Sequence, residues 1–305
     1  MSAVLHFSAA DAARIEPYLP PPSLSGSHSA ALLASSVSSV SSAQSTDRVR
    51  PFVTLTFATS LDSSLALAPG VRTALSGPQS KAMTHYLRSR HDAILVGVGT
   101  AEADDPALNC RIAAADTVGA ELSDPSSIST RQPRPIIVDP HDRWLLTHNS
   151  RVLATQRCGL GLAPYIITAV SEPDETKRQL LERHGGKYIT LNAISGSSDS
   201  GQKGAARFCW KDVLTCLARN GLGSIMIEGG GTVINTLLAP ENSPLVDSVI
   251  ITIAPTWLGR GGVVVSPDRV YDNSNNATAA ARLVDVKWQQ IGDDAVLCGR
   301  LNCHI

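Results

Sequence analysis

Residues 223–238 read GSIMIEGGGTVINTLL, and this stretch decides the fold. Its apolar run 224–227 is typical of a buried strand, and Glu228 interrupts the run before three glycines. An apolar segment of helical length begins at Thr232. Glycines let the backbone turn sharply and approach a ligand closely, and a helix N-terminus offers free N–H groups to an anion. Two interpretations stay open here: a phosphate-binding loop, or a tight strand-to-helix turn without any ligand.

Alternating strand and helix patterns surround this stretch. Strands are predicted at 52–58, 93–98, 135–138, 165–169, 187–191 and 246–254, and helices at 78–90, 172–184 and 210–220. Residues 281–290 and 295–301 follow as an antiparallel hairpin that turns around 292–294. This order predicts an α/β fold with a mixed sheet flanked by helices and a terminal antiparallel hairpin.

The first 49 residues are predicted to be an extension, and residues 50–305 the globular domain. The extension contains a short helix within 7–18 and a flexible, Ser/Ala-rich linker over 23–49, which has too few large apolar groups to order itself. Polar stretches at 113–132 and 195–205 are predicted surface insertions. This division predicts that removing residues 1–49 leaves the fold and ligand binding intact.

Composition excludes several classes of protein. The 305 residues are 43% hydrophobic and 17% charged, as in soluble globular proteins, and the formal net charge of -1 argues against nucleic acid as a partner. No apolar run is long enough to span a membrane, and the N-terminus does not resemble a secretory signal, so we expect a cytoplasmic location. The six cysteines form no Cys-x-x-Cys pair, so reduced thiols and no metal site are expected.

Thr100 and Asp104 follow the predicted strand 93–98 directly. Loops at the carboxyl ends of strands are where α/β sheets bind ligands. A hydroxyl and a carboxylate at this spacing suit hydrogen bonding to sugar hydroxyls or to an amide. The alternative is that Thr100 caps a helix while residues 104–106 form a turn.

Arginines gather nearby in the sequence. Arg88 and Arg90 end the predicted helix 78–90, and Arg111 follows the acidic turn. Since the arginine fork matches a phosphate, two of them from separate loops would clamp a substrate phosphate. The alternative is helix C-terminal charge favoured by the dipole, and for Arg90 this alternative is preferred.

Glu228 precedes the glycines and is a candidate to bind a substrate hydroxyl or amino group. It is not expected to contact a cofactor phosphate, because like charges repel. The alternative is an acid that caps backbone groups of the turn.

Several common catalytic motifs are absent from the sequence. There is no Gly-x-Gly-x-x-Gly after the first strand and no Gly-x4-Gly-Lys-Ser/Thr, which argues against a Rossmann dehydrogenase and a P-loop kinase. The Gly-x-Ser-x-Gly elbow and the His-x-Glu with Pro-Cys-x-x-Cys pattern of zinc deaminases are also missing.

Four blocks of sequence carry a family resemblance: RPFVTLTFATSLD (50–62), SGPQSKAMTHYLRSRHDAILVGVGTAEADDPALNCR (76–111), RPIIVDP (134–140) and IMIEGGGTVINTLL (225–238). In these the chain resembles the riboflavin-pathway reductases. That family comprises the fungal 2,5-diamino-6-ribosylamino-4(3H)-pyrimidinone 5′-phosphate reductases and the C-terminal domain of the bacterial bifunctional RibD protein.

The resemblance implies a dihydrofolate-reductase-like fold, NADPH as hydride donor and a homodimer. The implied reaction reduces the ribosylamino side chain to ribitylamino, through ring opening of the ribose to an imine at C1′. Implied NADPH contacts are Ala58, Thr100, Asp104, Asp139, Gly229, Gly230, Gly231, Thr232 and Val233. Implied substrate contacts are Arg88, Leu108, Arg111 and Glu228. The sequence singles out no general acid, and positioning is expected to dominate the hydride step.

One departure from the family concerns residues 60–64. Many relatives carry Ser-Leu-Asp-Gly-Lys, where this chain has Ser60-Leu61-Asp62-Ser63-Ser64, so a cation at position 64 is missing. Two alternatives to the implied function are a dihydrofolate-reductase-type enzyme and a non-catalytic nucleotide-binding relative. The first explains the arginines poorly, since the pteridine of folate carries no ribose phosphate.

Overall fold

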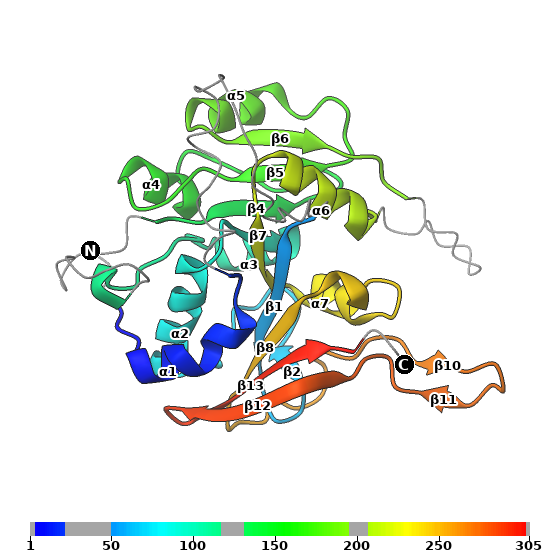
Figure 1. Cartoon of the computed structure of the whole chain (residues 1–305). Coiled ribbons are helices and arrows are strands. Elements are labelled where there is room, and N and C mark those ends of the chain that lie inside the picture. The colour runs from blue at the N-terminus through cyan, green and yellow to red at the C-terminus, as the bar shows by residue number, and fades with distance from the viewer. Residues whose placement is uncertain (1–3, 22–49, 117–130, 195–206, 303–305) are drawn as a thin grey trace, which may run out of the picture.

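A sheet built from both halves of the chain forms the centre of the molecule (Figure 1). The computed structural model describes residues 4–21, 50–116, 131–194 and 207–302. The predicted linker 23–49, the insertion 195–205 and most of the insertion 113–132 lie outside the described residues. The strands of the sheet are β1 (Phe52–Thr59), β3 (Ala93–Gly97), β4 (Arg134–Val138), β5 (Tyr165–Thr168), β6 (Lys187–Thr190), β7 (Ser224–Gly229), β8 (Ser248–Ile253), β12 (Leu283–Ile291) and β13 (Asp294–Leu301).

The nine strands lie in the order β12-β13-β8-β1-β7-β3-β4-β5-β6. Neighbouring strands from β8 to β6 are parallel, whereas β13 is antiparallel to both β8 and β12. The predicted mixed sheet with a terminal antiparallel hairpin is therefore confirmed. Shorter strands outside this sheet are β2 (Ser64–Ala66), which pairs with β9 (Val263–Val264), and β10 (Val270–Tyr271), which pairs with β11 (Ala277–Thr278).

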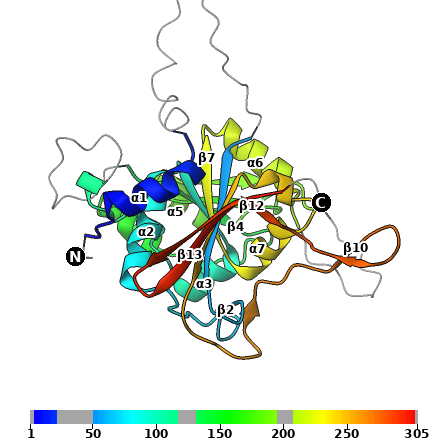
Figure 2. The same cartoon turned by 60° about the horizontal axis from the view of Figure 1, so that its bottom comes forward.

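Helices cover both faces of the sheet (Figures 1 and 2). No helix within the described ranges is long and apolar enough to cross a membrane. The α-helices are α1 (Ala9–Ile15), α2 (Pro78–Ser89), α3 (Val98–Asp104), α4 (Arg151–Arg157), α5 (Glu175–Arg183), α6 (Trp210–Arg219) and α7 (Gly231–Leu238), and 3-10 turns are η1 (Glu16–Tyr18), η3 (Ala114–Asp116) and η4 (Ser243–Leu245).

Successive side chains of the central strands pack on opposite faces of the sheet, and their contacts show which helices cover each face. In β7, Ile225 and Ile227 pack with α6 and α7, while Met226 between them packs with α1 and α2. In β3, Ile94 and Val96 belong to the cluster that contains residues of α3, α4 and α5. Successive side chains of a strand point to opposite faces, so uninterrupted apolar runs are what a sheet covered on both sides requires.

Helix α4 was not predicted, and a helix after the strand 93–98, observed as α3, was only the alternative interpretation. The residues of α3 were expected to form a strand end and a loop, and the structure instead begins a helix at Val98 with Gly97 as N-cap. This helix has only 7 residues and contains Gly99, a poor helix former, so its sequence lacks the long apolar periodicity that identifies helices.

The N-terminal extension packs on the domain. The predicted helix within 7–18 is present as α1 and η1, and Ser8 caps it by accepting a hydrogen bond from the Asp11 backbone N–H at 3.1 Å. Ile15 is fully buried and Leu19 is 5% exposed, in one apolar cluster with Met83 of α2. The expectation that residues 1–49 can be removed without effect is therefore revised, because truncation would expose this cluster to water.

His91 ties the end of α2 to the centre of the sheet. Its ring is fully buried, with Nδ1 2.7 Å from the Leu87 carbonyl oxygen and Nε2 2.8 Å from the Thr54 hydroxyl of β1. Burial lowers the pKa of His91 from 6.5 to about 4 and outweighs its hydrogen bond to Leu87, which acts to raise the pKa.

This lowered pKa predicts a loss of stability in mild acid. The unfolded chain takes up a proton at His91 near pH 6.5, whereas the folded chain resists it until about pH 4. The contribution of neutral His91 to the free energy of unfolding should therefore be fully present above pH 6.5. It should be lost as the pH falls toward 4, by up to about 1.4 kcal/mol per pH unit. Urea unfolding of the wild type and of His91→Asn at several pH values measures this slope. An equal slope in both proteins would contradict the prediction.

Candidate active site

A cavity of about 600 Å³ opens where four parallel strands end. Its lining includes Ala58 at the end of β1, Val98 after β3, Val138 at the end of β4, and Glu228 and Gly230 at the end of β7. The loop 65–73 forms a further wall. Carboxyl ends of parallel strands are the usual ligand-binding edge of an α/β sheet.

Strand β7 does not end at Ile227, as the sequence had predicted, but continues to Gly229. Leu95 of β3 pairs with Ile227 and the next residue of β3, Val96, pairs with Gly229, so Glu228 is the extra residue of a β-bulge. Bulges bend a strand and redirect a side chain. Here the bulge places the Glu228 side chain between α2 and the cavity.

The glycine turn after β7 depends on the absence of side chains. Gly229 has φ +128°, which favours glycine, and the peptide bond between Gly229 and Gly230 is cis. A Cβ on Gly230 would lie 2.9 Å from the Thr100 hydroxyl, and one on Gly231 would lie 2.5 Å from Val263. Helix α7 then begins without a side-chain cap. A backbone cradle with uncapped helix N–H groups fits an anionic ligand such as a dinucleotide phosphate.

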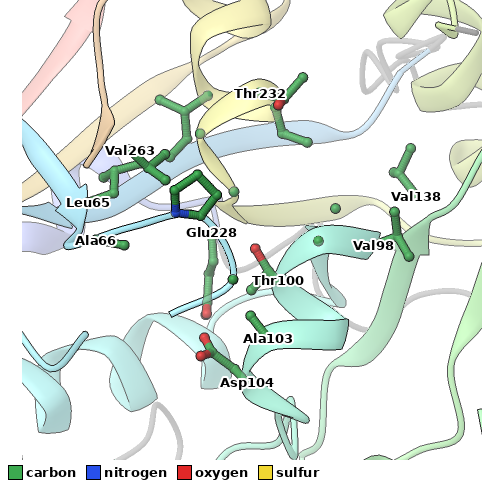
Figure 3. Close-up of a pocket in the computed structure, with 18 of the residues that line it drawn as sticks. Leu65, Ala66, Val98, Thr100, Ala103, Asp104, Val138, Glu228, Thr232 and Val263 are labelled. Carbon is green, nitrogen blue, oxygen red and sulfur yellow. The ribbon is translucent and has the colours of Figure 1, made fainter. Parts of the chain in front are cut away.

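Thr100 and Asp104 both line the cavity, from the first turn and the end of α3. Figure 3 shows Thr100 facing the glycine turn, and the carboxylates of Asp104 and Glu228 directed toward the same region of the cavity. One Asp104 oxygen, Oδ1, is buried and has no hydrogen-bond partner among the described residues, and burial raises the pKa of this carboxyl group. The alternative role of Thr100 as a helix cap is not observed, since Gly97 is the N-cap. The pair remains free to meet a ligand.

A buried ion pair joins α2 to β7. Arg88 donates from Nε and Nη2 to the two carboxylate oxygens of Glu228, both at 2.7 Å, and from Nη1 to the Asn109 carbonyl oxygen at 3.0 Å. Burial acts to lower the pKa of Arg88, but the attraction of Glu228 outweighs it and the pKa is raised. In this structure Arg88 holds Glu228 in place, and neither Arg88 nor Arg111 lines the cavity, so the clamp of two arginines on a phosphate stays a prediction.

Arg111 lies beside His85 of α2. Its backbone N–H donates to His85 Nδ1 at 3.0 Å, and its guanidinium Nη2 is 3.1 Å from Nε2. Burial, together with the charges of Arg88 and Arg111, lowers the pKa of His85 to about 2, so its ring is neutral. Arg111 has no carboxylate partner within the described part of the chain, and burial and two neighbouring arginines lower its pKa.

The remaining predicted site residues divide into two groups. Gly231, Thr232 and Val233 line the cavity, as do Ala58 and Gly230. Leu108 and Asp139 do not: Leu108 is buried in the apolar cluster under α3, and the fully buried Asp139 accepts a hydrogen bond from the Trp144 N–H at 2.8 Å. Gly229 is not itself a lining residue.

Sequence reasoning missed the basic residues that line the cavity. These are Arg72 in the loop 65–73, Arg207 before α6, and His141 and Arg143 after β4. A signal was present for the last two, because they follow a strand of the parallel sheet within a few residues. Within the described ranges, no group of three or more His, Cys, Asp and Glu side chains is placed to hold a metal ion.

Comparison with known proteins gives consistent results. The sequence model of the RibD C-terminal domain matches residues 51–297. The chain is 42% identical over 253 residues to the 2,5-diamino-6-ribosylamino-4(3H)-pyrimidinone 5′-phosphate reductase of Debaryomyces hansenii, covering 83% of this chain and 90% of that protein. It is 38% identical over 261 residues to the Saccharomyces cerevisiae protein of the same name, covering 85% and 90% of the two chains.

Solved structures agree on the fold. The riboflavin biosynthesis reductase Rib7 of Saccharomyces cerevisiae superposes with a TM-score of 0.62 at 33% identity, covering 85% of this chain and 93% of that one. RibD of Acinetobacter baumannii gives a TM-score of 0.60 at 21% identity, covering 84% of this chain and 59% of that one, and supports the fold alone. The family match spans more than half of the chain and includes the strands that surround the cavity, so the chain belongs to the RibD C-terminal domain family.

Proposed function

We propose that this protein reduces the ribosylamino side chain of 2,5-diamino-6-ribosylamino-4(3H)-pyrimidinone 5′-phosphate to the ribitylamino form, with NADPH as reductant. The fungal relatives bear the name of this reductase. The observation that carries the proposal is the cavity itself, which is lined by the glycine turn, by two carboxylates and by four basic side chains. Such a lining offers groups for a phosphorylated cofactor and for a second ligand beside it.

In this proposal the glycine turn and the start of α7 hold the cofactor's phosphates. Asp104 accepts hydrogen bonds from the cofactor's sugar hydroxyl or amide groups, and the Thr100 hydroxyl both accepts and donates them. The Asp104 Oδ1, which has no partner among the described residues, supports this role. Ala58, Asp139 and Val233 complete the proposed cofactor contacts, Asp139 by fixing the backbone of the loop after β4. When bound, NADPH supplies the hydride.

The proposed substrate end contains Glu228, Arg111 and Leu108, with Arg88 behind them. The paired guanidinium holds the Glu228 carboxylate in place, so it can accept hydrogen bonds from substrate hydroxyl or amino groups without reorganising. Arg111 is the cation proposed to bind the 5′-phosphate, because no carboxylate in the described structure neutralises it. Leu108 supports this end from the core.

Turnover tests the proposal directly. Purified protein mixed with NADPH and the ribosylamino pyrimidine phosphate should consume NADPH, followed by absorbance at about 340 nm, and should form the ribitylamino product, identified by mass spectrometry. Dihydrofolate serves as the control substrate. Oxidation with dihydrofolate alone would support a dihydrofolate-reductase-type enzyme instead, and NADPH binding without any turnover would support a non-catalytic relative.

The choice of NADPH over NADH is proposed from the basic region of the cavity. His141 and Arg143 follow β4, which ends at Val138 (Figure 3), and both line the cavity. Arg143 is 54% exposed and 3.3 Å from Glu102, so a stronger anion can compete for it. Arginine near the adenosine ribose is a common means of accepting the 2′-phosphate.

Arg143→Ala should therefore weaken NADPH binding about tenfold and leave NADH binding unchanged, because the two cofactors differ only in the 2′-phosphate. Dissociation constants from cofactor fluorescence measure both. Glu102→Gln is the matched control, which frees Arg143 from its partner and should bind NADPH as well as the wild type or better. Equal weakening of both cofactors by Arg143→Ala would contradict the assignment.

A homodimer and a cytoplasmic location are part of the same proposal. Strand β12 lies at one edge of the sheet and exposes Val284, Val286 and Trp288, at 38%, 41% and 62%. Long edge strands with exposed apolar side chains are suited to pairing. The described cysteines are free thiols, which fits a reducing compartment.

Dimerisation through β12 predicts that Trp288→Lys yields a monomer, because two buried lysines would face each other across a symmetric interface. Light scattering coupled to size exclusion measures the mass. Trp257→Lys, at a tryptophan outside β12 that is 73% exposed, is the control and should leave the dimer intact. A wild-type monomer, or dimers of both variants, would contradict this interface.

A further inference from the structure

The N-terminal segment, defined as residues 5–20, lies along α2 and reaches the residues before η3 (Figures 1 and 2). It includes α1 and η1 and packs in one apolar cluster with Met83 and Tyr86 of α2. Among the described residues, no member of this segment lines the cavity. It nevertheless contacts Arg111, which belongs to the proposed substrate end, and the last turn of α2.

The first of these contacts fixes the backbone of Arg111. The Leu5 N–H donates to the Arg111 carbonyl oxygen at 3.0 Å, and the Ala113 N–H donates to the Leu5 carbonyl oxygen at 2.8 Å. Together they form a parallel bridge that pairs Leu5 with Ile112. Since the Arg111 N–H is held by His85, both backbone polar groups of Arg111 have a partner, one from the N-terminal segment and one from α2.

A second contact anchors the segment a few residues further along. The Phe7 N–H donates to the Asp116 carboxylate at 3.0 Å, and the His6 ring lies 3.2 Å from the same oxygen. The stretch that carries Arg111 is therefore held on both sides of the bridge. Without these bonds, its polar backbone groups would have to find water instead.

The third contact binds the segment to the last turn of α2. Glu16 accepts hydrogen bonds from the Tyr86 hydroxyl and from Arg90. Arg90, expected to serve only the helix dipole, is 3% exposed and also donates to the Pro20 carbonyl oxygen at 3.0 Å. Residues four apart share a helix face, so Tyr86 and Arg90 form one face of this turn.

The opposite side of the same turn contacts two residues of the proposed substrate end, Arg111 and Glu228. His85 holds the Arg111 backbone, and Arg88, three residues later, holds Glu228. The turn thus lies between the N-terminal segment and the substrate end. A shift of this turn would move Arg111 and Glu228 first, whereas α3 and the basic region are attached to other elements.

We propose that the N-terminal segment is a positioning element for the substrate's phosphate: it fixes the backbone of Arg111, and so sets substrate affinity without affecting cofactor affinity. The inference rests on the proposed function in one respect, that Arg111 binds the 5′-phosphate. Leu5 and Glu16 are its positioning residues, acting through Arg111 and through α2.

Leu5→Pro tests the inference, because it removes the single N–H that bonds to Arg111 and changes no charge. The matched control is Val4→Pro, which places the same ring one residue earlier. We expect Leu5→Pro to raise the substrate KM about tenfold, with kcat and the NADPH dissociation constant within about twofold of wild type, since misplacing a binding group weakens the interactions that it makes. Asp116→Asn, which weakens the second anchor, should shift KM in the same direction.

Equilibrium binding of ribose 5-phosphate to the NADP-loaded protein, by calorimetry, gives a readout that does not require turnover. Leu5→Pro should weaken it several-fold and Val4→Pro should not. Weakening of both ribose 5-phosphate and NADPH to the same extent, or of neither, would overturn the inference and indicate a role in stability alone. Absence of wild-type turnover would contradict the proposed function, while the calorimetric comparison would still decide the inference.

Discussion

The ion pair between Arg88 and Glu228 is the interaction on which the rest of the site depends. Both side chains are largely withdrawn from water, at 14% and 15% exposure, so each charge needs the other. The pair joins α2 to the bulge of the central strand β7, and its third hydrogen bond reaches the chain at Asn109. Three segments far apart in the sequence are thereby held at one point, beside the cavity.

From this point the site extends along the carboxyl edge of the parallel strands. The glycine turn follows Glu228, and there the absence of a Cβ lets the Thr100 hydroxyl approach the backbone of Gly230. Arg111 lies outside the cavity lining and is held by His85, whose neutral ring accepts the Arg111 N–H. The Glu228 carboxylate lies between the glycine turn that follows it and α2, where Arg88 holds it. Parallel strands provide this arrangement because their ends converge on a single edge.

Much of the fold could be predicted because buried strands are short apolar runs bounded by turn residues, as in 93–98 and 135–138. Helix α3 could not, since a helix of 7 residues that contains a glycine has no distinctive period. The bulge at Glu228 was equally hidden, because it is a property of pairing with β3 and not of β7 alone. The N-terminal helix was predicted, but its burial against Met83 depends on where α2 lies.

The sequence by itself determined the mixed α/β fold, the glycine turn and the set of polar residues around it, because backbone freedom, apolar runs and residue chemistry are local properties. Only the tertiary structure decided which polar groups meet. It pairs Arg88 with Glu228 and places Arg111 beside a neutral His85. It also bonds the backbone of Leu5 to that of Arg111, more than a hundred residues later in the sequence. Side-chain partners follow from how distant elements pack, and several partners for each charge are compatible with the same local pattern until packing selects one.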